Sequence, residues 1–412
     1  MLHKLSKEKL NLAIYMFTDM LAKGIPFLLL PVYTIYLKPE QFGNIAIFNV
    51  IVEIAIIFVV FGANSFYRVE YFKPERASNL LASLFKNLII TFPAALLLTG
   101  IFIAIDINPG SQSDHWLFSA VLIALMQSIV LLVIAEYQCQ GKALWVGALN
   151  LTSATVTAIV TVLLLNLDFA EESRYWGFFI GAISTALLSL LLIRYQHSSL
   201  NVLQSHFSKP ALSFGLGILP HALSWWARTG MDRFLIAKFV SVYQVGLYSV
   251  AAQISLIIIV FANAANQAFT PKLMQMLAVK HYKESFALCI KIIAIYLLIS
   301  IAVVVAGNFI FDWFINEKYR QAADLLPYMC LIALCQATVT LLSNFLYFFK
   351  HVKALSMITS LTSLLHVGLA YFLVQTYSVK GVIVSSIVTY LISAVIIFCF
   401  AWRLLKKELE NS

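Results

Sequence analysis

The sequence predicts an all-α integral membrane protein with about twelve transmembrane helices in two six-helix lobes. Hydrophobic residues make up 61% and charged residues 11% of the 412-residue chain, against roughly 45–50% and about 25% in soluble domains. The mean hydropathy is +0.88. Apolar runs of the length that crosses a bilayer, about 20 residues, recur along the whole chain. These observations exclude a soluble enzyme, a disordered chain and a collagen-like chain.

The spans follow from the apolar runs. The N-terminus is basic and then apolar, like a signal peptide, but no small-residue cleavage site follows, so we expect a retained first span. No stretch between the spans is long enough for a water-soluble domain. The predicted spans cover roughly 11–36, 43–66, 84–105, 116–138, 143–166, 175–194, 211–239, 245–269, 286–306, 324–347, 354–375 and 381–402.

The distribution of Lys and Arg predicts the topology. With the N-terminus inside, the inside loops carry Lys4, Lys7, Lys9, Arg68, Lys73, Arg76, Lys86, Lys142, Arg194, Lys209, Lys272, Lys280, Lys283, Lys350, Lys353, Arg403, Lys406 and Lys407. The outside loops carry only Lys38, Arg174, Lys318, Arg320 and Lys380. Because cytoplasmic loops carry the excess of cations, both termini are predicted to be cytoplasmic.

An internal repeat indicates two lobes. Residues 36–43 join spans 1 and 2, residues 239–246 join spans 7 and 8, and Gln41 and Gly43 match Gln244 and Gly246 at an offset of about 203. The Lys-Ala-Leu sequences that open spans 5 and 11 match at an offset of about 211. The predicted lobes are residues 1–197 and 198–412. Six helices per copy give both copies the same orientation, with the pseudo-symmetry axis along the membrane normal.

Ionisable residues inside the spans are the candidate functional residues, since such groups usually face a cavity or a partner. Span 1 holds Asp19 and Lys23, four residues apart on one helical face. Span 2 holds Glu53. Span 7 holds a stripe with Arg228 and Asp232, followed by Arg233. Each Asp could instead form a structural pair with its neighbouring cation. Arg68 and Lys272 follow spans 2 and 8 and form a predicted cytoplasmic rim, and Glu136 is expected at the cytoplasmic surface.

Two spans combine these charges with helix breakers. Gly24, Pro26 and Pro31 interrupt span 1, and Gly215, Gly217 and Pro220 interrupt span 7. The glycines and prolines permit a kink, because proline leaves a backbone carbonyl without its helical donor. The first helix of each lobe is therefore predicted to bend during transport.

Motifs of other function classes are absent from the sequence. The five cysteines show no metal-ligand spacing, and no basic block indicates nucleic acid. There is no Walker, GxSxG or HExxH motif. We therefore predict no catalytic residues, no metal and no cofactor, and transport driven by an ion gradient, the membrane potential or substrate removal.

The segments Pro26–Pro31 with Tyr33, and Asp232–Ile236 followed by Val245–Tyr248, resemble the openings of the two halves of bacterial polysaccharide exporters. The chain resembles the oligosaccharide-lipid flippases, O-antigen flippases included, of the multidrug/oligosaccharidyl-lipid/polysaccharide exporter superfamily. This resemblance implies a non-enzymatic flippase in the bacterial inner membrane, working by alternating access on an undecaprenyl-pyrophosphate-linked oligosaccharide. It implies contacts with membrane lipids, and makes a polysaccharide polymerase and a chain-length regulator candidate partners.

By the same resemblance Lys23, Arg228 and Arg233 would bind the pyrophosphate in a cationic cavity. Asp19, Glu53 and Asp232 depart from a purely cationic pattern, and could couple ions or position the cations. Two alternatives stay open: an ion-coupled multidrug antiporter of the same superfamily, and a membrane glycan polymerase or ligase. The short outside loops disfavour the second alternative.

Overall fold

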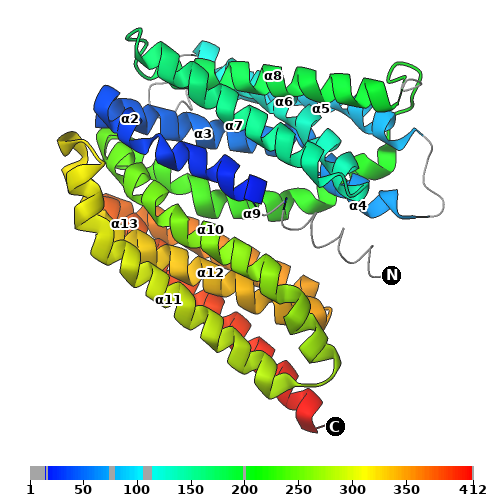
Figure 1. Ribbon diagram of the computed structural model, residues 1–412, viewed down its shortest axis with the longest axis vertical. Coiled ribbons are helices and arrows are strands. Elements are labelled where there is room, and N and C mark those ends of the chain that lie inside the picture. Colours follow the sequence, from blue (N-terminus) through cyan, green and yellow to red (C-terminus); the bar gives the residue numbers. More distant parts are fainter. Residues whose placement is uncertain (1–13, 15–16, 74–78, 105–113, 198–200, 411–412) are drawn as a thin grey trace. The chain divides into compact units, whose positions relative to one another are not determined.

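The computed structural model describes all residues except 1–13, 15–16, 74–78, 105–113, 198–200 and 411–412. Its described part is helical and contains no strand (Figure 1). Nine of its helices are long and apolar enough to cross a membrane. The last of them, α13 (Val352–Glu410), is interrupted at Ser378 (φ 53°, ψ −140°) and holds two predicted spans. Two predicted spans remain. The first corresponds to the helix over residues 17–28 together with α2, and the seventh corresponds to α9. The predicted fold class is confirmed.

The helices divide into two compact units. The first unit contains residues up to Leu37 and Asn44–Leu223, and the second contains Lys38–Gly43 and Ser224–Ser412. The borders of these units differ from those of the lobes that the repeat predicts, and the lobes stay a prediction. The first unit holds α2 (Leu30–Tyr36), most of α3 (Pro39–Val60), α4 (Ala63–Tyr71), α5 (Leu80–Ala104), α6 (Asp114–Cys139), α7 (Ala143–Leu165), α8 (Glu172–Gln196) and the start of α9 (Lys209–Phe239).

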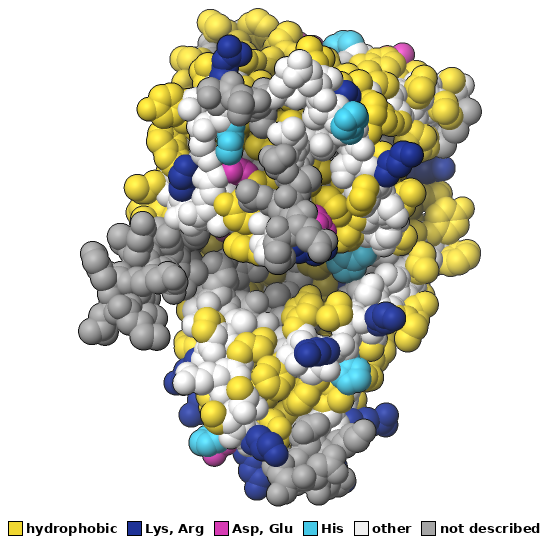
Figure 2. Space-filling model, turned by 90° about the vertical axis from the view of Figure 1, so that its right-hand side faces the viewer, with side chains coloured by type: hydrophobic (Ala, Val, Ile, Leu, Met, Phe, Trp, Pro, Cys, Tyr) yellow, Lys and Arg dark blue, Asp and Glu magenta, His cyan; other side chains and the backbone are white. Residues whose placement is uncertain are grey.

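The second unit is built around four long apolar segments. They are α10 (Val242–Ala278), α11 (Tyr282–Trp313), α12 (Leu326–Phe348), preceded by the 3-10 helix η1 (Glu317–Leu325), and α13. Large apolar side chains such as Leu97, Val305 and Phe372 are at least 70% exposed, and one face shows hydrophobic side chains over much of its described surface (Figure 2). Such surfaces suit contact with lipid rather than water.

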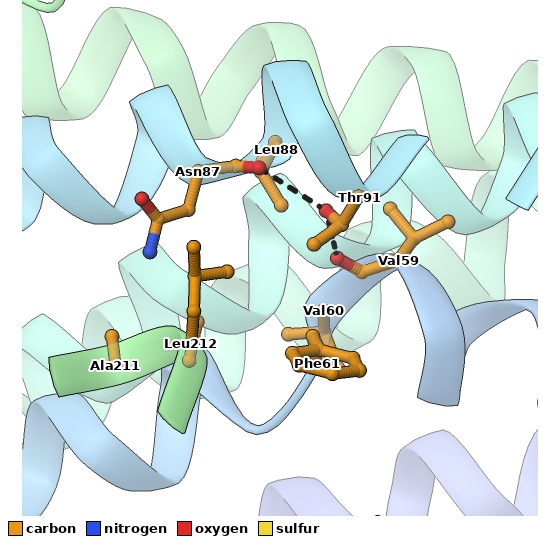
Figure 3. Close-up of a pocket in the computed structure, with 9 residues that line it drawn as sticks. Val59, Val60, Phe61, Asn87, Leu88, Thr91, Ala211 and Leu212 are labelled. Carbon is orange, nitrogen blue, oxygen red and sulfur yellow. Dashed lines mark hydrogen bonds between the residues drawn. The ribbon is translucent and has the colours of Figure 1, made fainter. Parts of the chain in front are cut away.

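The second predicted span is broken near its end. α3 stops at Val60, and Phe61 (φ 46°) and Gly62 (φ 70°) take left-handed conformations before α4 begins. The Thr91 hydroxyl donates to the carbonyl of Val59 at 2.7 Å, which satisfies one of the acceptors at the end of α3. A cavity of about 10 Å³ lies beside the break, between α5 and the start of α9 (Figure 3).

The start of α9 is fixed to the first unit. Lys86 of α5 donates to the carbonyls of Leu203 at 2.9 Å and Ser205 at 2.5 Å. Its neighbour Asn87 exchanges two hydrogen bonds with the backbone of Ser208, at 3.0 and 3.1 Å. α9 then passes from the first unit to the second after Leu223, three residues beyond Pro220. The predicted helix breaker therefore lies close to the point where the chain changes units.

Small residues bring α7 and α8 together. A methyl group added to Gly177 would overlap the Thr161 hydroxyl and come within 2.9 Å of the carbonyl of Thr157. One turn later, a methyl on Gly181 would overlap the hydroxyl of Thr157. This is the small-xxx-small pattern that lets membrane helices pack at backbone contact.

Gly177→Ala is expected to destabilise the protein by about 1–3 kcal/mol, because the added methyl overpacks the helix interface. Thermal unfolding in detergent, followed by fluorescence, measures this effect. Gly100→Ala in α5 is the matched control, since nothing lies within 4 Å of a methyl group there. Equal melting temperatures for the two variants would contradict the tight α7–α8 contact.

Candidate functional site

Arg228 lies buried inside the second unit, with 5% of its surface exposed. Its Nη1 donates to the Thr362 hydroxyl at 3.3 Å and its Nη2 to the Ser393 hydroxyl at 3.0 Å. The guanidinium stacks on the ring of Tyr390 at 3.7 Å, a cation–π geometry that stabilises a buried cation. The Arg228 Nε has no hydrogen-bond partner. The cation is thus held by hydroxyl groups and an aromatic ring.

Asp232, one helical turn further along α9, is also buried, with 3% of its surface exposed. Its Oδ1 lies 2.8 Å from the Nε2 of His366. Its Oδ2 accepts from the Tyr248 hydroxyl at 2.6 Å and from the Ser386 hydroxyl at 3.2 Å. Three donors therefore surround this carboxylate, as a buried carboxylate requires.

The structure does not pair Arg228 with Asp232, although the sequence left that pairing open. Each charge has its own neighbours, drawn from α10 and from both halves of α13. Both shells use both halves of α13, and within the Arg228 shell the Ser393 hydroxyl donates to the Thr362 hydroxyl across these halves at 2.9 Å. We call this group the α9 polar cluster; its members are Arg228, Asp232, Tyr248, Thr362, His366, Ser385, Ser386, Tyr390 and Ser393.

His366 completes the cluster and was missed in the sequence analysis. Its side chain is fully buried, and its Nδ1 lies 3.0 Å from the Ser385 hydroxyl, which also bonds the His366 carbonyl at 2.9 Å. An imidazole fixed on both ring nitrogens beside a carboxylate can accept or release a proton. The signal that could have found it is an ionisable residue near the middle of a predicted span.

The charges predicted in the first unit are more exposed. Lys23 Nζ contacts Asp19 Oδ2 at 2.7 Å, and the two side chains are 49% and 39% exposed. This confirms the intrahelical pair that their spacing predicts. Glu53 lies on α3 with an exposed side chain. Because these residues and Arg228 belong to different units, a common cavity stays a prediction.

The remaining predicted cations have local contacts. Arg233 is partly buried, donates from Nη1 to the Thr229 carbonyl at 2.8 Å and lies over the ring of Tyr248 at 5.9 Å. Arg68, on α4 in the first unit, donates from Nε to Gln138 at 3.0 Å. Lys272, on α10 in the second unit, is exposed. The cytoplasmic rim that Arg68 and Lys272 would form stays a prediction.

Glu136 is a correction. Instead of an exposed surface position it has a buried one, 2% exposed, near the end of α6. Its carboxylate accepts from the Tyr67 hydroxyl and from Gln140, and lies 3.2 Å from the Nε2 of His197. The physical reason is that α4 and the end of α8 fold over this helix end and supply hydrogen-bond donors. Sequence periodicity cannot show Tyr67 and His197 as neighbours, because they lie 69 and 61 residues away along the chain.

The turn between α7 and α8 contacts the first span. The Tyr36 hydroxyl donates to Asn166 at 2.6 Å, and Arg174 donates to the Tyr33 hydroxyl at 3.0 Å. Glu171 accepts from Asn44 Nδ2 at 3.3 Å. Desolvation on burial and, to a smaller degree, the neighbouring Glu172 raise the pKa of Glu171, against an opposing contribution from Asn44.

Glu171 should therefore make stability fall with rising pH. Because its pKa is higher in the folded than in the unfolded protein, its contribution is full below the unfolded pKa and is lost as pH rises through the folded pKa. Glu171→Gln, which keeps an acceptor for Asn44, should flatten the pH profile of thermal stability, by less than about 1 kcal/mol because the group is only partly buried. Asp168→Asn, at an exposed position of the same turn, is the control. A profile unchanged by Glu171→Gln would refute the assignment.

Within the described residues, no group of three or more His, Cys, Asp or Glu side chains could hold a metal ion. The residues considered for function are the buried carboxylate–imidazole pair of Asp232 and His366, the buried guanidinium of Arg228 and the partly exposed ion pair of Asp19 and Lys23. All lie on helices of membrane-spanning length or their broken continuations. These groups can bind anions or exchange protons.

Sequence comparison then decides the family. A family model described as "Polysaccharide biosynthesis protein" matches residues 10–277. The chain belongs to this family. The "Lsg locus putative protein 1" of Haemophilus influenzae is 30% identical over 267 residues, which make up 63% of this chain and 64% of that protein. An uncharacterized membrane protein of the same organism is 25% identical over 381 residues, 86% of this chain and 88% of that protein.

The fold matches transporters of known structure. An inward-facing multidrug resistance MATE family transporter of the MOP superfamily superposes with a TM-score of 0.67 at 14% identity, over 97% of this chain and 99% of that chain. An outward-facing structure from the same family gives 0.65 at 16% identity, over 98% and 97%. These likenesses concern the fold. Family and apolar helices together make the protein a multi-pass membrane protein of the polysaccharide biosynthesis family, with a fold like that of these transporters.

Proposed function

We propose that the protein is a flippase that moves a polyprenyl-pyrophosphate-linked oligosaccharide from the cytoplasmic to the periplasmic leaflet of the bacterial inner membrane. The observation that carries the proposal is the family match over residues 10–277, in a chain whose fold is that of transporters. When a glycan is assembled on a lipid carrier at the cytoplasmic face, its polar headgroup must be moved across the bilayer. A transporter of this family would supply that step. The glycan would be an O-antigen or another surface polysaccharide unit.

Positive charge is what a pyrophosphate needs inside a membrane, since a desolvated anion is otherwise too costly. Lys23 and Arg233 are partly exposed and can reach a headgroup directly. Arg228 is 5% exposed, and would contact the pyrophosphate only after leaving Thr362 and Ser393. Arg offers a planar fork and Lys a point charge to the phosphates.

Asp232 with His366 is the proposed coupling site, and Asp19 and Glu53 are the other candidate carboxylates. Asp232 Oδ1 and His366 Nε2 lie 2.8 Å apart, and the two side chains are 4% and 0% exposed, respectively. Loss or gain of one proton would change the charge of a closed cluster that joins α9, α10 and α13. Such a change can bias a conformational equilibrium, because a buried charge without a partner is costly.

The second candidate function is an ion-coupled multidrug antiporter. The names of the matching structures, which are multidrug transporters, and the buried carboxylate of Asp232 favour it. An antiporter would not depend on Lys23 and Arg233, whereas a pyrophosphate carrier would. A polymerase or ligase is disfavoured because family and fold are those of transporters.

The purified protein in proteoliposomes tests the proposal. The expected result is translocation of a fluorescent polyprenyl-pyrophosphate oligosaccharide, measured as loss of accessibility to an enzyme outside the vesicles. Lys23→Ala together with Arg233→Ala should abolish it, and the exposed Arg403→Ala should not. Efflux of cationic drugs without any glycolipid translocation would overturn the proposal in favour of the antiporter. Periplasmic thiol labelling of residues 168–174 checks the topology on which the direction depends.

A further inference from the structure

An uncharged polar face lies on α10 and α12, inside the second unit. Both helices are apolar enough to cross a membrane, and neither α12 nor residues 242–271 of α10 contain an Asp, Glu, Lys or Arg. Both nevertheless carry amides and hydroxyls in the middle of an apolar run. We call this group the amide face; its members are Asn263, Asn266 and Gln267 on α10, and Gln336, Thr340 and Asn344 on α12.

One hydrogen bond fixes the two helices at a common level. Asn344 Nδ2 donates to Asn266 Oδ1 at 2.7 Å and to the Leu341 carbonyl at 2.9 Å, and Asn344 is only 6% exposed. α10 contacts both α11 and α12, and α11 returns the chain between them, so that α10 and α12 run in the same direction (Figure 1). Residues that are equally far along the two helices from this bond therefore lie at the same depth.

The remaining members of the face turn towards one side of this helix pair. At about 100° per residue, Asn263 and Gln267 lie clockwise from Asn266 when α10 is viewed from its N-terminus. Thr340 and Gln336 lie anticlockwise from Asn344 in the same view of α12. In two parallel helices that touch, these opposite rotations lead to the same side of the contact. The face extends about 14 Å along the helices, at 1.5 Å per residue.

Three amides of the face have no structural task. In the described part of the chain, the side chains of Asn263, Gln267 and Gln336 make no hydrogen bond. Gln267 is exposed, and the other two are partly buried. Hydrogen bonding between helices accounts for Asn266 and Asn344, but not for these three. Because an amide without a partner is costly in hydrocarbon, they are expected to meet water or a polar ligand.

The chemistry of the face selects an uncharged ligand rich in hydroxyl groups. Each amide side chain offers two donors and an acceptor, which complement hydroxyls that both donate and accept. A pyrophosphate needs cations, and a cationic drug favours carboxylates or aromatic rings, so neither would gain much here. We propose that the amide face binds the sugar residues of the transported glycolipid. This inference rests on the proposed function for the identity of the ligand, and leaves the pyrophosphate to the cations.

Protection of an engineered thiol tests the contact with sugar. Gln267→Cys, in a chain whose five native cysteines are replaced by Ala, is labelled with a water-soluble maleimide in nanodiscs. The free oligosaccharide, released by mild acid from the bacterium's own polyprenyl carrier, should slow this labelling at least about fivefold at saturation. Inorganic pyrophosphate should not. The control is Gln275→Cys, an exposed position two turns further along α10, whose labelling neither compound should slow.

Three outcomes of the labelling would overturn the proposal. They are a Gln267→Cys thiol that is not labelled at all, labelling that the oligosaccharide does not slow, and equal protection by pyrophosphate. The first would show that the face is closed to water. The second would show that no sugar binds there, and the third that the site recognises an anion rather than hydroxyl groups.

Transport kinetics separate this proposal from the proposed function. Asn263→Leu together with Gln267→Leu should raise the glycolipid content needed for half-maximal translocation at least about tenfold, because hydrogen bonds to the sugar are lost. Gln375→Leu, which removes an exposed amide of α13, is the control and should leave it unchanged. Unchanged kinetics in the folded double variant would overturn the amide face and leave the flippase standing. Protection by oligosaccharide in a protein that moves no glycolipid would refute the flippase and support the face.

Discussion

Arg228→Ala is expected to abolish export of surface glycan in a flippase-null strain, at normal membrane levels of the protein. The substitution removes two hydrogen bonds from a charged donor, to Thr362 and Ser393, each worth about 1.5–3 kcal/mol. If the free energy of these hydrogen bonds stabilises the transition state of transport, each 1.4 kcal/mol that is lost lowers the transport rate about tenfold. Surface polysaccharide, normalised to protein by immunoblot, measures the effect.

Two further variants separate charge from packing. Arg228→Lys keeps the charge without the fork and should retain part of the export, whereas Arg228→Met keeps much of the volume without the charge and should retain none. Arg228→Glu should be inactive. The exposed Arg403 of the same unit supplies the control, Arg403→Ala. Normal export by Arg228→Ala at normal protein level would refute a transport role for this side chain.

Much of the fold was predictable from composition and periodicity. Long apolar runs predict spans because an unsatisfied backbone cannot cross a bilayer, and the i,i+4 spacing of Asp19 and Lys23 predicts their pair. The repeat at Gly43 and Gly246 was visible in one sequence because a glycine needed at backbone contact tolerates no side chain. These features depend on local rules or on self-similarity.

The partners of the buried charges were not predictable from the same sequence. His366 lies 134 residues from Asp232, and the cluster's other members are mostly hydroxyl residues, which are common in membrane helices and carry no periodic signal. The break at Phe61–Gly62 fell inside a predicted span, since an apolar run continues through it. Long-range pairing requires the packing of α9 against α10 and α13, which a single sequence does not encode in any local pattern.

Asp232→Asn is expected to lower export at least about tenfold and to remove its dependence on the proton gradient. Asn keeps the size of Asp232 but can neither carry the charge nor take up a proton. It also turns a donor towards neighbours that already donate, Tyr248 and Ser386, a mismatch worth about 1–3 kcal/mol. The measurement is translocation in proteoliposomes with an imposed pH difference, with and without a protonophore.

The His366 partner decides between coupling and mere positioning. If Asp232 and His366 exchange a proton, translocation by His366→Gln should be insensitive to the protonophore, as in Asp232→Asn. This should hold although Gln can still donate a hydrogen bond to the carboxylate. If the carboxylate only orders the cluster, His366→Gln should keep both rate and sensitivity, because the hydrogen bond at 2.8 Å is replaced. Ser385→Ala, which removes only the outer hydroxyl next to the imidazole, is the matched control and should keep the gradient dependence. Gradient-dependent translocation that survives in both Asp232→Asn and His366→Gln would place the coupling elsewhere, with Asp19 and Glu53 as the carboxylates to examine next.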